Sequence, residues 1–448
     1  MKLWDKGFDT DRFTERFTVG RDRELDTLLA RADILGNIAH ARGLRAIGLL
    51  SGEETRALVD ALRLLHRSVE AGDFSMGPEV EDIHSRVEFF LAGRLGDPGK
   101  KIHAGRSRND QVLLDLKLFT RDRLFSLLDR VEALFELLLA RAGEGKDILL
   151  PGYTHLQVAM PSSFGLWFGG YAESLAEDLV LLKAARDVVN TNPLGTGAGY
   201  GSSIPLDRAL VTRLLAFDDL AYNPVHAQMQ RGKMEQTVLF ALSRVALTVG
   251  RLAADVCLFT SPNFGFLSLP DRFTTGSSIM PHKKNPDVFE LVRARCNRLQ
   301  ALPGQVGMIA ANLTSGYFRD MQLVKEVYLP AFAELDDCLF MTTLVLGEAA
   351  LARDLLEDDR YRYLFTVEEV NRAVAAGVPF REAYRAVGER VQRGEFVVTD
   401  RRVHHVHEGS IGNLCLDRVR AKFDRGKEGW NVEATRAAER DLLEASVD

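Results

Sequence analysis

The longest uninterrupted helical pattern in the chain runs from Gln111 to Ala142, a stretch without glycine or proline. As a single α-helix it would be about 48 Å long at the usual rise of 1.5 Å per residue. Four further segments show long helical periodicity, at about 162–190, 228–260, 286–312 and 322–355. Several of these segments are apolar on more than one face. The pattern predicts an extended five-helix bundle that buries its extra apolar faces against other subunits.

Shorter helical patterns precede and follow the long segments. Ser51 and Glu54 have the spacing of a capping box, and the apolar face that follows them ends at Gly72. Strand patterns are sparse, and no alternating segments flank an Asn-Gly turn. We therefore predict an all-α, elongated subunit of three domains: an N-terminal helical domain at 1–105, a central long-helix bundle at 106–356 and a small C-terminal helical domain at 357–448.

Composition excludes several classes of protein. The 57 Lys and Arg against 63 Asp and Glu give a net charge of −6, which is too balanced for a general nucleic-acid binder. The four cysteines are widely spaced, so no local zinc or dithiol motif can form. Free thiols and a charged N-terminus without an apolar signal segment predict a protein of the reducing cytoplasm.

The segment 148–172 contains no Asp, Glu, Lys or Arg and is long enough to span a bilayer. It also contains Pro151, Pro161 and His155, and prolines leave backbone groups unsatisfied in lipid. We interpret it as a buried, uncharged active-site segment, and we expect no membrane partner.

The segment Thr275–Asp287, TGSSIMPHKKNPD, combines flexible residues with hydroxyl, imidazole, ammonium and amide groups. Pro286 suits the first turn of the helix that follows, and a helix N-terminus offers free N–H groups to an anion. The segment therefore predicts a clamp for carboxylate or phosphate. Composition alone leaves a solvated interhelical loop as the alternative.

This loop resembles the signature loop of the fumarase/aspartase superfamily, whose members eliminate a group from a succinyl moiety and release fumarate. Within the superfamily the chain most resembles the argininosuccinate lyase family. Three further blocks carry that resemblance, in the family's order and spacing: HAGRSRNDQ at 103–111, PGYTHLQ at 151–157 and YFRDMQLVKE at 317–326.

The resemblance implies a homotetramer with a core of twenty helices, five from each subunit, and active sites shared between subunits. It also implies cleavage of argininosuccinate to arginine and fumarate, the final step of arginine biosynthesis, without a metal or other cofactor.

Cleavage of the Cβ–H and C–N bonds places charge on the adjacent carboxylate, and buried cations and amide donors stabilise such a state. Lys283 and Asn285 are the matching positions for this role. The resemblance implies Ser277 as the base and His155 as the acid that protonates the leaving nitrogen. The reverse assignment remains open, and a buried structural histidine is the alternative for His155.

The resemblance also implies a set of substrate-binding positions. They are Thr18, where the family usually has serine, and Arg108, Asn109, Thr154, Tyr317, Gln322 and Lys325. Two positions depart from the family pattern: His282 replaces a usual Gln, and Arg319 replaces a usual Lys. The first adds a group that can titrate, and the second keeps the charge but changes its geometry.

The glycine-rich stretch 195–201 does not match a dinucleotide-binding motif, because Tyr200 breaks the spacing and a helix precedes it. Three alternative functions remain. The first is another fumarate-releasing lyase, acting on adenylosuccinate, aspartate or malate. The second is a non-enzymatic, crystallin-like structural protein on the same scaffold, and the third is a helical interaction module.

Overall fold

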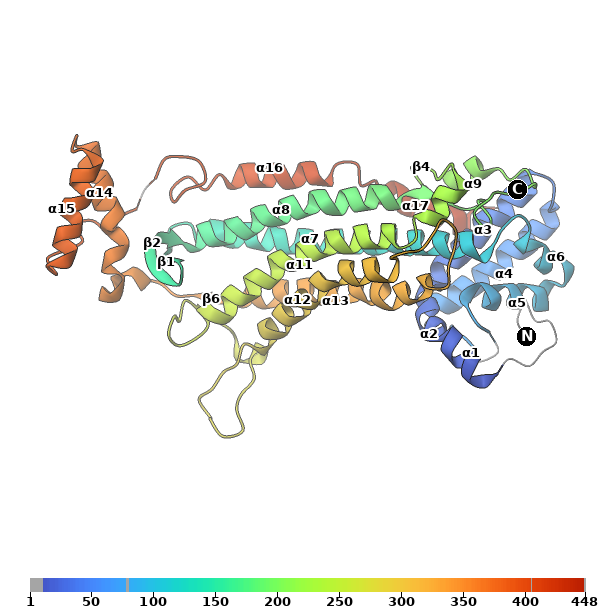
Figure 1. The fold of residues 1–448 in the computed structure, drawn as a ribbon, viewed down its shortest axis with the longest axis horizontal. Coiled ribbons are helices and arrows are strands. Elements are labelled where there is room, and N and C mark those ends of the chain that lie inside the picture. Colours follow the sequence, from blue (N-terminus) through green and yellow to red (C-terminus); the bar gives the residue numbers. More distant parts are fainter. Residues whose placement is uncertain (1–10, 78–79, 404, 447–448) are drawn as a thin grey trace.

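The computed structural model describes residues 11–77, 80–403 and 405–446. The expectation about an N-terminal signal falls on the first ten residues, which lie outside the described part. Five long helices run along the molecule (Figure 1). They are α7 (Arg108–Glu144), α8 (Phe164–Val189), α11 (Lys233–Phe259), α12 (Asp287–Ile309) and α13 (Met321–Glu348). The predicted all-α fold is confirmed.

Helix α7 is longer than the glycine-free segment predicts because strong capping signals flank it. Ser107 and Asp110 form a capping box at its start, and Gly145 ends it. Gly143 lies inside the helix. At 1.5 Å per residue, α7 is about 55 Å long, and it separates the two ends of the subunit.

The bundle core is apolar and aromatic. Helices α11 and α12 pack together along their length, and α7 packs against α8 and α13. Phe119 and Phe332 meet edge to face with ring centroids 5.6 Å apart. Cys296 and Cys338 are buried in helices α12 and α13. Helix α11 alone among the described segments is long and apolar enough to cross a membrane, and most of it is buried in the bundle.

Short helices form the N-terminal end of the subunit, at the right of Figure 1. They are α1 (Arg12–Val19), α2 (Asp22–Asp26), η1 (Thr27–Leu29), α3 (Ala30–Ala46), α4 (Gly52–Glu70), α5 (Ile83–Leu95), α6 (Asp97–Lys100) and η2 (Lys101–His103). The predicted capping box of Ser51 and Glu54 is present at the start of α4. Helix α3 is buried on most of its surface and contacts both α4 and α7.

The connections within the central region contain small elements. They are β3 (Thr191–Asn192), α9 (Arg208–Leu214), β4 (Asp219–Leu220), α10 (Pro224–Met229), β5 (Leu267–Ser268), η3 (Asp271–Phe273) and β6 (Ala350–Leu351). The helix predicted from residue 228 begins at Lys233, because Gly232 adopts a φ of +80° and interrupts the pattern.

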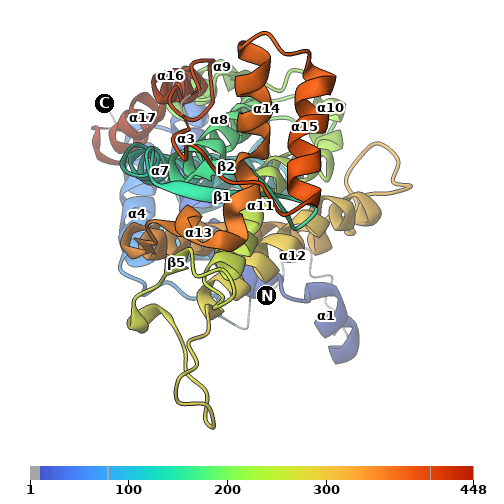
Figure 2. The ribbon, with the colours of Figure 1, turned by 90° about the vertical axis from the view of Figure 1, so that its left-hand side faces the viewer.

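The C-terminal residues lie at both ends of the molecule. Elements η4 (Leu355–Glu357), η5 (Asp359–Phe365), α14 (Thr366–Ala375) and α15 (Phe380–Gln392) form the far end, at the front of Figure 2. Helix α16 (Leu416–Lys427) then returns along α8, and α17 (Val432–Glu444) reaches α3. The division at residues 105 and 356 stays a prediction. In that division, α17 belongs to the predicted C-terminal domain but packs against α3 at the N-terminal end of the subunit.

A β-hairpin, β1 (Leu149–Thr154) and β2 (Gln157–Ser163), occupies most of the uncharged segment. The expectation of no hairpin was wrong. The predicted burial of the segment holds for Leu150, Phe164 and Phe168, whereas residues 154–158 around the turn are exposed in the single chain. His155 and Leu156 form the turn with φ values of 54° and 57°, where Asn-Gly is the usual signal. That unusual turn sequence explains why the hairpin could not be predicted.

Candidate active site

A cavity of about 190 Å³ lies where the N-terminal helices meet the bundle. Its wall contains five of the predicted substrate-binding residues, Arg108, Asn109, Tyr317, Gln322 and Lys325. Arg108 and Asn109 begin α7, Tyr317 lies in the loop before α13, and the other two lie in the first turns of α13. Helices α7 and α13 run side by side in the same direction, because Thr120 bonds Tyr328 and, further along both helices, Arg130 bonds Asp336. Their first turns therefore meet at one end of the bundle and bring two distant motifs together.

Thr18 does not line this cavity, but its backbone carbonyl is bonded to two residues that do, Gln322 and Arg319. Gln322 Nε2 donates to Thr18 O at 2.9 Å and to Val19 O at 2.8 Å, and Arg319 Nε donates to Thr18 O at 3.2 Å. The Thr18 hydroxyl is bonded to Thr14 O within α1, at 2.8 Å. These contacts hold α1 beside the cavity. Arg319, which replaces a usual lysine, also bonds Glu81 at 2.6 Å.

Lys325 forms the floor of the cavity with two carboxylates. Its ammonium group lies 2.7 Å from Asp26 and 2.8 Å from Asp22, and its side chain is almost fully buried. Burial opposes the charge of Lys325, but the two carboxylates outweigh that effect and raise its pKa. Burial raises the pKa of Asp22 to about 6, partly offset by Lys325. The ammonium group is thus held charged and fixed in direction.

Arg108 is held by partners from the residues that precede and begin α5. Its guanidinium lies 3.2 Å from Asp82 and donates to Ser85 Oγ at 2.7 Å. The side chain is about one-quarter exposed, so it remains accessible from the cavity. An arginine in this setting can bind a carboxylate with two parallel hydrogen bonds.

Asp110 connects the start of α7 to the glycine-rich loop at 195–201. Its Oδ2 accepts from Gly195 N at 2.9 Å and Gly197 N at 2.8 Å, and its Oδ1 accepts from Ser107 N at 2.8 Å. The carboxyl is buried, which raises its pKa. Asp110 therefore fixes the backbone that carries Arg108 and Asn109.

Replacing Asp110 with asparagine is expected to lower kcat/KM for the substrate by about tenfold to a hundredfold, because an amide NH2 would face backbone N–H donors. Steady-state kinetics would measure the effect. Asp207→Asn is the matched control, since Asp207 caps the exposed start of α9. Equal kinetic losses in both variants would contradict the positioning role of Asp110.

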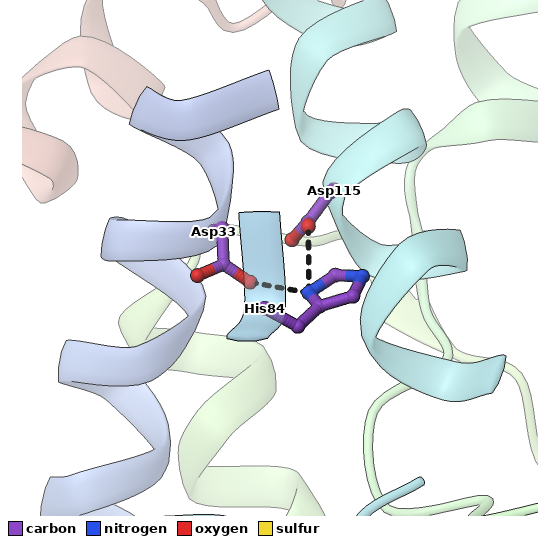
Figure 3. Close-up of side chains that lie close together, drawn as sticks. All are labelled: Asp33, His84 and Asp115. Carbon is purple, nitrogen blue, oxygen red and sulfur yellow. Dashed lines mark hydrogen bonds and ion pairs between the residues drawn. The ribbon is translucent and has the colours of Figure 1, made fainter. Parts of the chain in front are cut away.

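A buried group beside the cavity has no sequence motif that predicts it. His84 Nδ1 lies 2.7 Å from Asp33 and 3.6 Å from Asp115, and all three side chains are at most 5% exposed (Figure 3). Burial opposes the charge of His84, but Asp33 and neighbouring acids outweigh it and raise its pKa. Burial and Asp33 raise the pKa of Asp115 well above its usual range. This raised pKa favours the neutral form of Asp115 beside Asp33.

Among the described residues, the same three form a group that could hold a metal by distance, with one ligand atom from each lying within 4.8 Å of the others. Two carboxylates and an imidazole suit a transition metal. However, His84 Nδ1 is already bonded to Asp33, and Arg106 lies close enough to act on both carboxylates electrostatically. The geometry favours a proton-sharing network that supports the cavity.

Thr154 and His155 lie at the opposite end of the bundle from this cavity, at the tip of the hairpin (Figure 1). Both side chains are exposed, as is Leu156. The length of α7, about 55 Å, separates this tip from Arg108. One subunit therefore does not bring His155 to the predicted substrate-binding residues.

The loop that contains Ser277, Lys283 and Asn285 projects away from the bundle in both views (Figures 1 and 2). A bridge between Thr275 and Asn285 closes its base. Ser277 Oγ accepts from Met280 N at 3.2 Å, and Lys283 is exposed. The loop thus presents a hydroxyl and a cation away from their own subunit.

Comparisons with known proteins agree with the four sequence blocks. Residues 6–301 match the family described as Lyase. The chain is 57% identical to the argininosuccinate lyase of Bacteroides fragilis strain ATCC 25285 over 99% of both chains. The chain belongs to the argininosuccinate lyase family. A more distant member, the argininosuccinate lyase of Thermotoga neapolitana, is 39% identical over 88% of this chain and 98% of its own.

Solved structures place the fold of this argininosuccinate lyase family member among the fumarate lyases. An EDDS lyase in complex with formate matches with a TM-score of 0.78 and 20% identity, covering 98% of this chain and 96% of its own. The class II fumarase of Schistosoma mansoni matches with a TM-score of 0.70 and 18% identity, covering 85% and 89%. Similarity at this identity shows the fold alone.

Proposed function

We propose that this protein cleaves argininosuccinate to arginine and fumarate, the last step of arginine biosynthesis, in the cytoplasm. The observation that carries the proposal is the cavity where Arg108, Asn109, Tyr317, Gln322 and Lys325 meet in a member of this family. Its cations can bind substrate carboxylates, and its Asp and Glu side chains can bind the cationic part of the substrate.

In the proposed reaction, Ser277 removes the Cβ proton and His155 protonates the leaving nitrogen, with the reverse assignment as the alternative. Lys283 and Asn285 stabilise the charge that develops on the neighbouring carboxylate. A serine hydroxyl is a weak base near pH 7, so it needs the loop cation close to it when the substrate is bound. The exposed position of the loop is consistent with closure over a bound substrate.

Fumarate release can be followed directly by its ultraviolet absorbance. We expect turnover with argininosuccinate and none above background with adenylosuccinate, aspartate or malate. Activity on adenylosuccinate alone would contradict the assignment. A folded protein with no turnover on any of the four would favour the crystallin-like alternative.

We further propose a homotetramer in which each active site combines segments from three subunits. Large apolar side chains support this assembly, since Leu291, Met308 and Phe340 of the bundle helices are 59%, 81% and 45% exposed in the single chain. Leu156, next to His155, is 75% exposed, and Ile279, close to Ser277, is 83% exposed. Docking of these segments against other subunits would bury them and complete the site.

Mixing inactive His155→Asn and Ser277→Ala chains tests the shared site. Because each mixed tetramer would contain some sites with both wild-type residues, we expect activity to recover to a sizeable fraction of wild type after denaturation and joint refolding. Size-exclusion chromatography would check that the mixtures are tetrameric. Mixed tetramers without recovered fumarate release would contradict shared sites.

A further inference from the structure

A second cavity, of about 340 Å³, lies on the other side of the loop that carries Tyr317. Residues from α10, the start of α11, the end of α12 and the loop 313–318 surround it. Its volume is at the small end of the range for ligand pockets in proteins. None of the residues assigned to catalysis or substrate binding lines it.

Two buried polar side chains on the wall of this cavity have unused hydrogen-bonding capacity. Arg231 is 7% exposed, with Nε bonded to Glu235 at 2.8 Å and Nη2 bonded to Met321 O at 3.1 Å. Its Nη1 has no hydrogen-bond partner among the described residues. Gln228 is 1% exposed, and within the described part of the chain neither atom of its amide is hydrogen-bonded. Buried groups of this kind are costly unless something binds them.

The charge around the cavity is positive. Its lining side chains include the cations of Arg231 and Lys233 and no carboxylate. Glu235 does not line the cavity, but it forms an ion pair with Arg231 and neutralises its charge. The charge of Lys233 therefore remains as the net charge of the lining. The 27-residue helix α11 begins at Lys233, and its N-terminus adds partial positive charge. These features select an anion over a cation or a neutral ligand.

The loop forms a common wall between the two cavities. Tyr317 and Arg319 line the substrate cavity, whereas Gly316 and Phe318 line the second cavity. Residues that alternate along this loop thus line different cavities. A molecule in the second cavity would limit the positions available to Tyr317 and Arg319.

We propose that this second cavity is a binding site for a small carboxylate anion, held by Arg231 Nη1, Gln228 and Lys233. Binding there stabilises the loop and changes the affinity of the adjacent substrate cavity. The binding itself is independent of the proposed function, while the effect on substrate affinity rests on it.

Calorimetric titration of the purified assembly with malonate, together with a crystal structure of the malonate complex, tests the proposal. We expect malonate at Arg231 and Lys233 in the crystal, in addition to any at the active site. Lys233→Gln is expected to weaken malonate binding in the second cavity about fivefold, while the fumarate-forming activity without malonate stays unchanged. Ala310→Met, which places a larger side chain in the cavity wall, is expected to abolish malonate binding there.

Lys146→Gln is the matched control, because it removes the same charge from an exposed position beyond the other end of α7. It is expected to leave malonate binding unchanged. A second cavity without malonate in the crystal structure would overturn the proposed site. Equal weakening of malonate binding by Lys233→Gln and Lys146→Gln would overturn it as well. If malonate binds but the KM for argininosuccinate does not change with its concentration, the coupling is overturned. If the protein binds malonate in the second cavity but releases no fumarate from argininosuccinate when malonate is absent, that result counts against the proposed function and not against the site.

Discussion

Replacing Ser277 with alanine is expected to lower kcat for fumarate release by about 10²–10⁴-fold, the range typical for loss of a general base. The KM should change little, because Ser277 lies outside the cavity that contains the predicted substrate-binding residues. The base of the loop should keep its shape, since the backbone bridge between Thr275 and Asn285 does not involve the Ser277 side chain, while the bond from Met280 N to Ser277 Oγ is lost. Steady-state kinetics of fumarate formation would measure both constants.

Ser278→Ala is a close control for this variant, because Ser278 is the neighbouring hydroxyl on the same exposed loop. It is expected to retain kcat within a few-fold of wild type. A fully active Ser277→Ala enzyme would contradict the role of Ser277. Equal losses in the two variants would point to a general effect on the loop.

Replacing Glu439 with alanine is expected to destabilise the subunit by about 3–5 kcal/mol, the usual cost of removing one partner of a buried ion pair. Glu439 accepts from Arg121 at 3.1 Å and from Arg31 at 2.7 Å. The Arg121 side chain is 1% exposed, so its charge would remain buried without its carboxylate partner. Urea denaturation monitored by circular dichroism would measure the loss.

Glu433→Ala is the control on the same helix. The side chain of Glu433 is 87% exposed, and its nearest cation, on Arg436, is 4.0 Å away. Exposed pairs of this kind contribute about 0–1 kcal/mol. A similar loss of stability in both variants would show that the helix, and not the buried ion pair, is responsible.

The helical fold could be predicted because its signals are local. The capping box at Ser51 and the glycine-free segment after Gln111 each specify a helix from neighbouring residues. The hairpin around His155 could not be predicted, because prolines interrupt its strands and its turn lacks glycine. Tertiary pairing of the two strands outweighs the weak local preference there.

The candidate site was predictable only where a motif marks it. Arg108 and Lys325 lie in sequence blocks that resemble the family, and they line one cavity. The buried cluster of Asp33, His84 and Asp115 combines three separate helices and has no local pattern. Contacts between residues so far apart in sequence depend on how the helices pack, which periodicity alone does not specify.

The return of α17 to the N-terminal end has a consequence for how the protein is made. Arg31 and its partner Glu439 are 408 positions apart along the chain. At a ribosomal speed of about 5–20 residues per second, the first residue emerges roughly 20–80 seconds before the second. Throughout that interval the surface later covered by Leu442 is open, and chaperones have time to bind it. The part of the molecule synthesised first is therefore among the last to be completed.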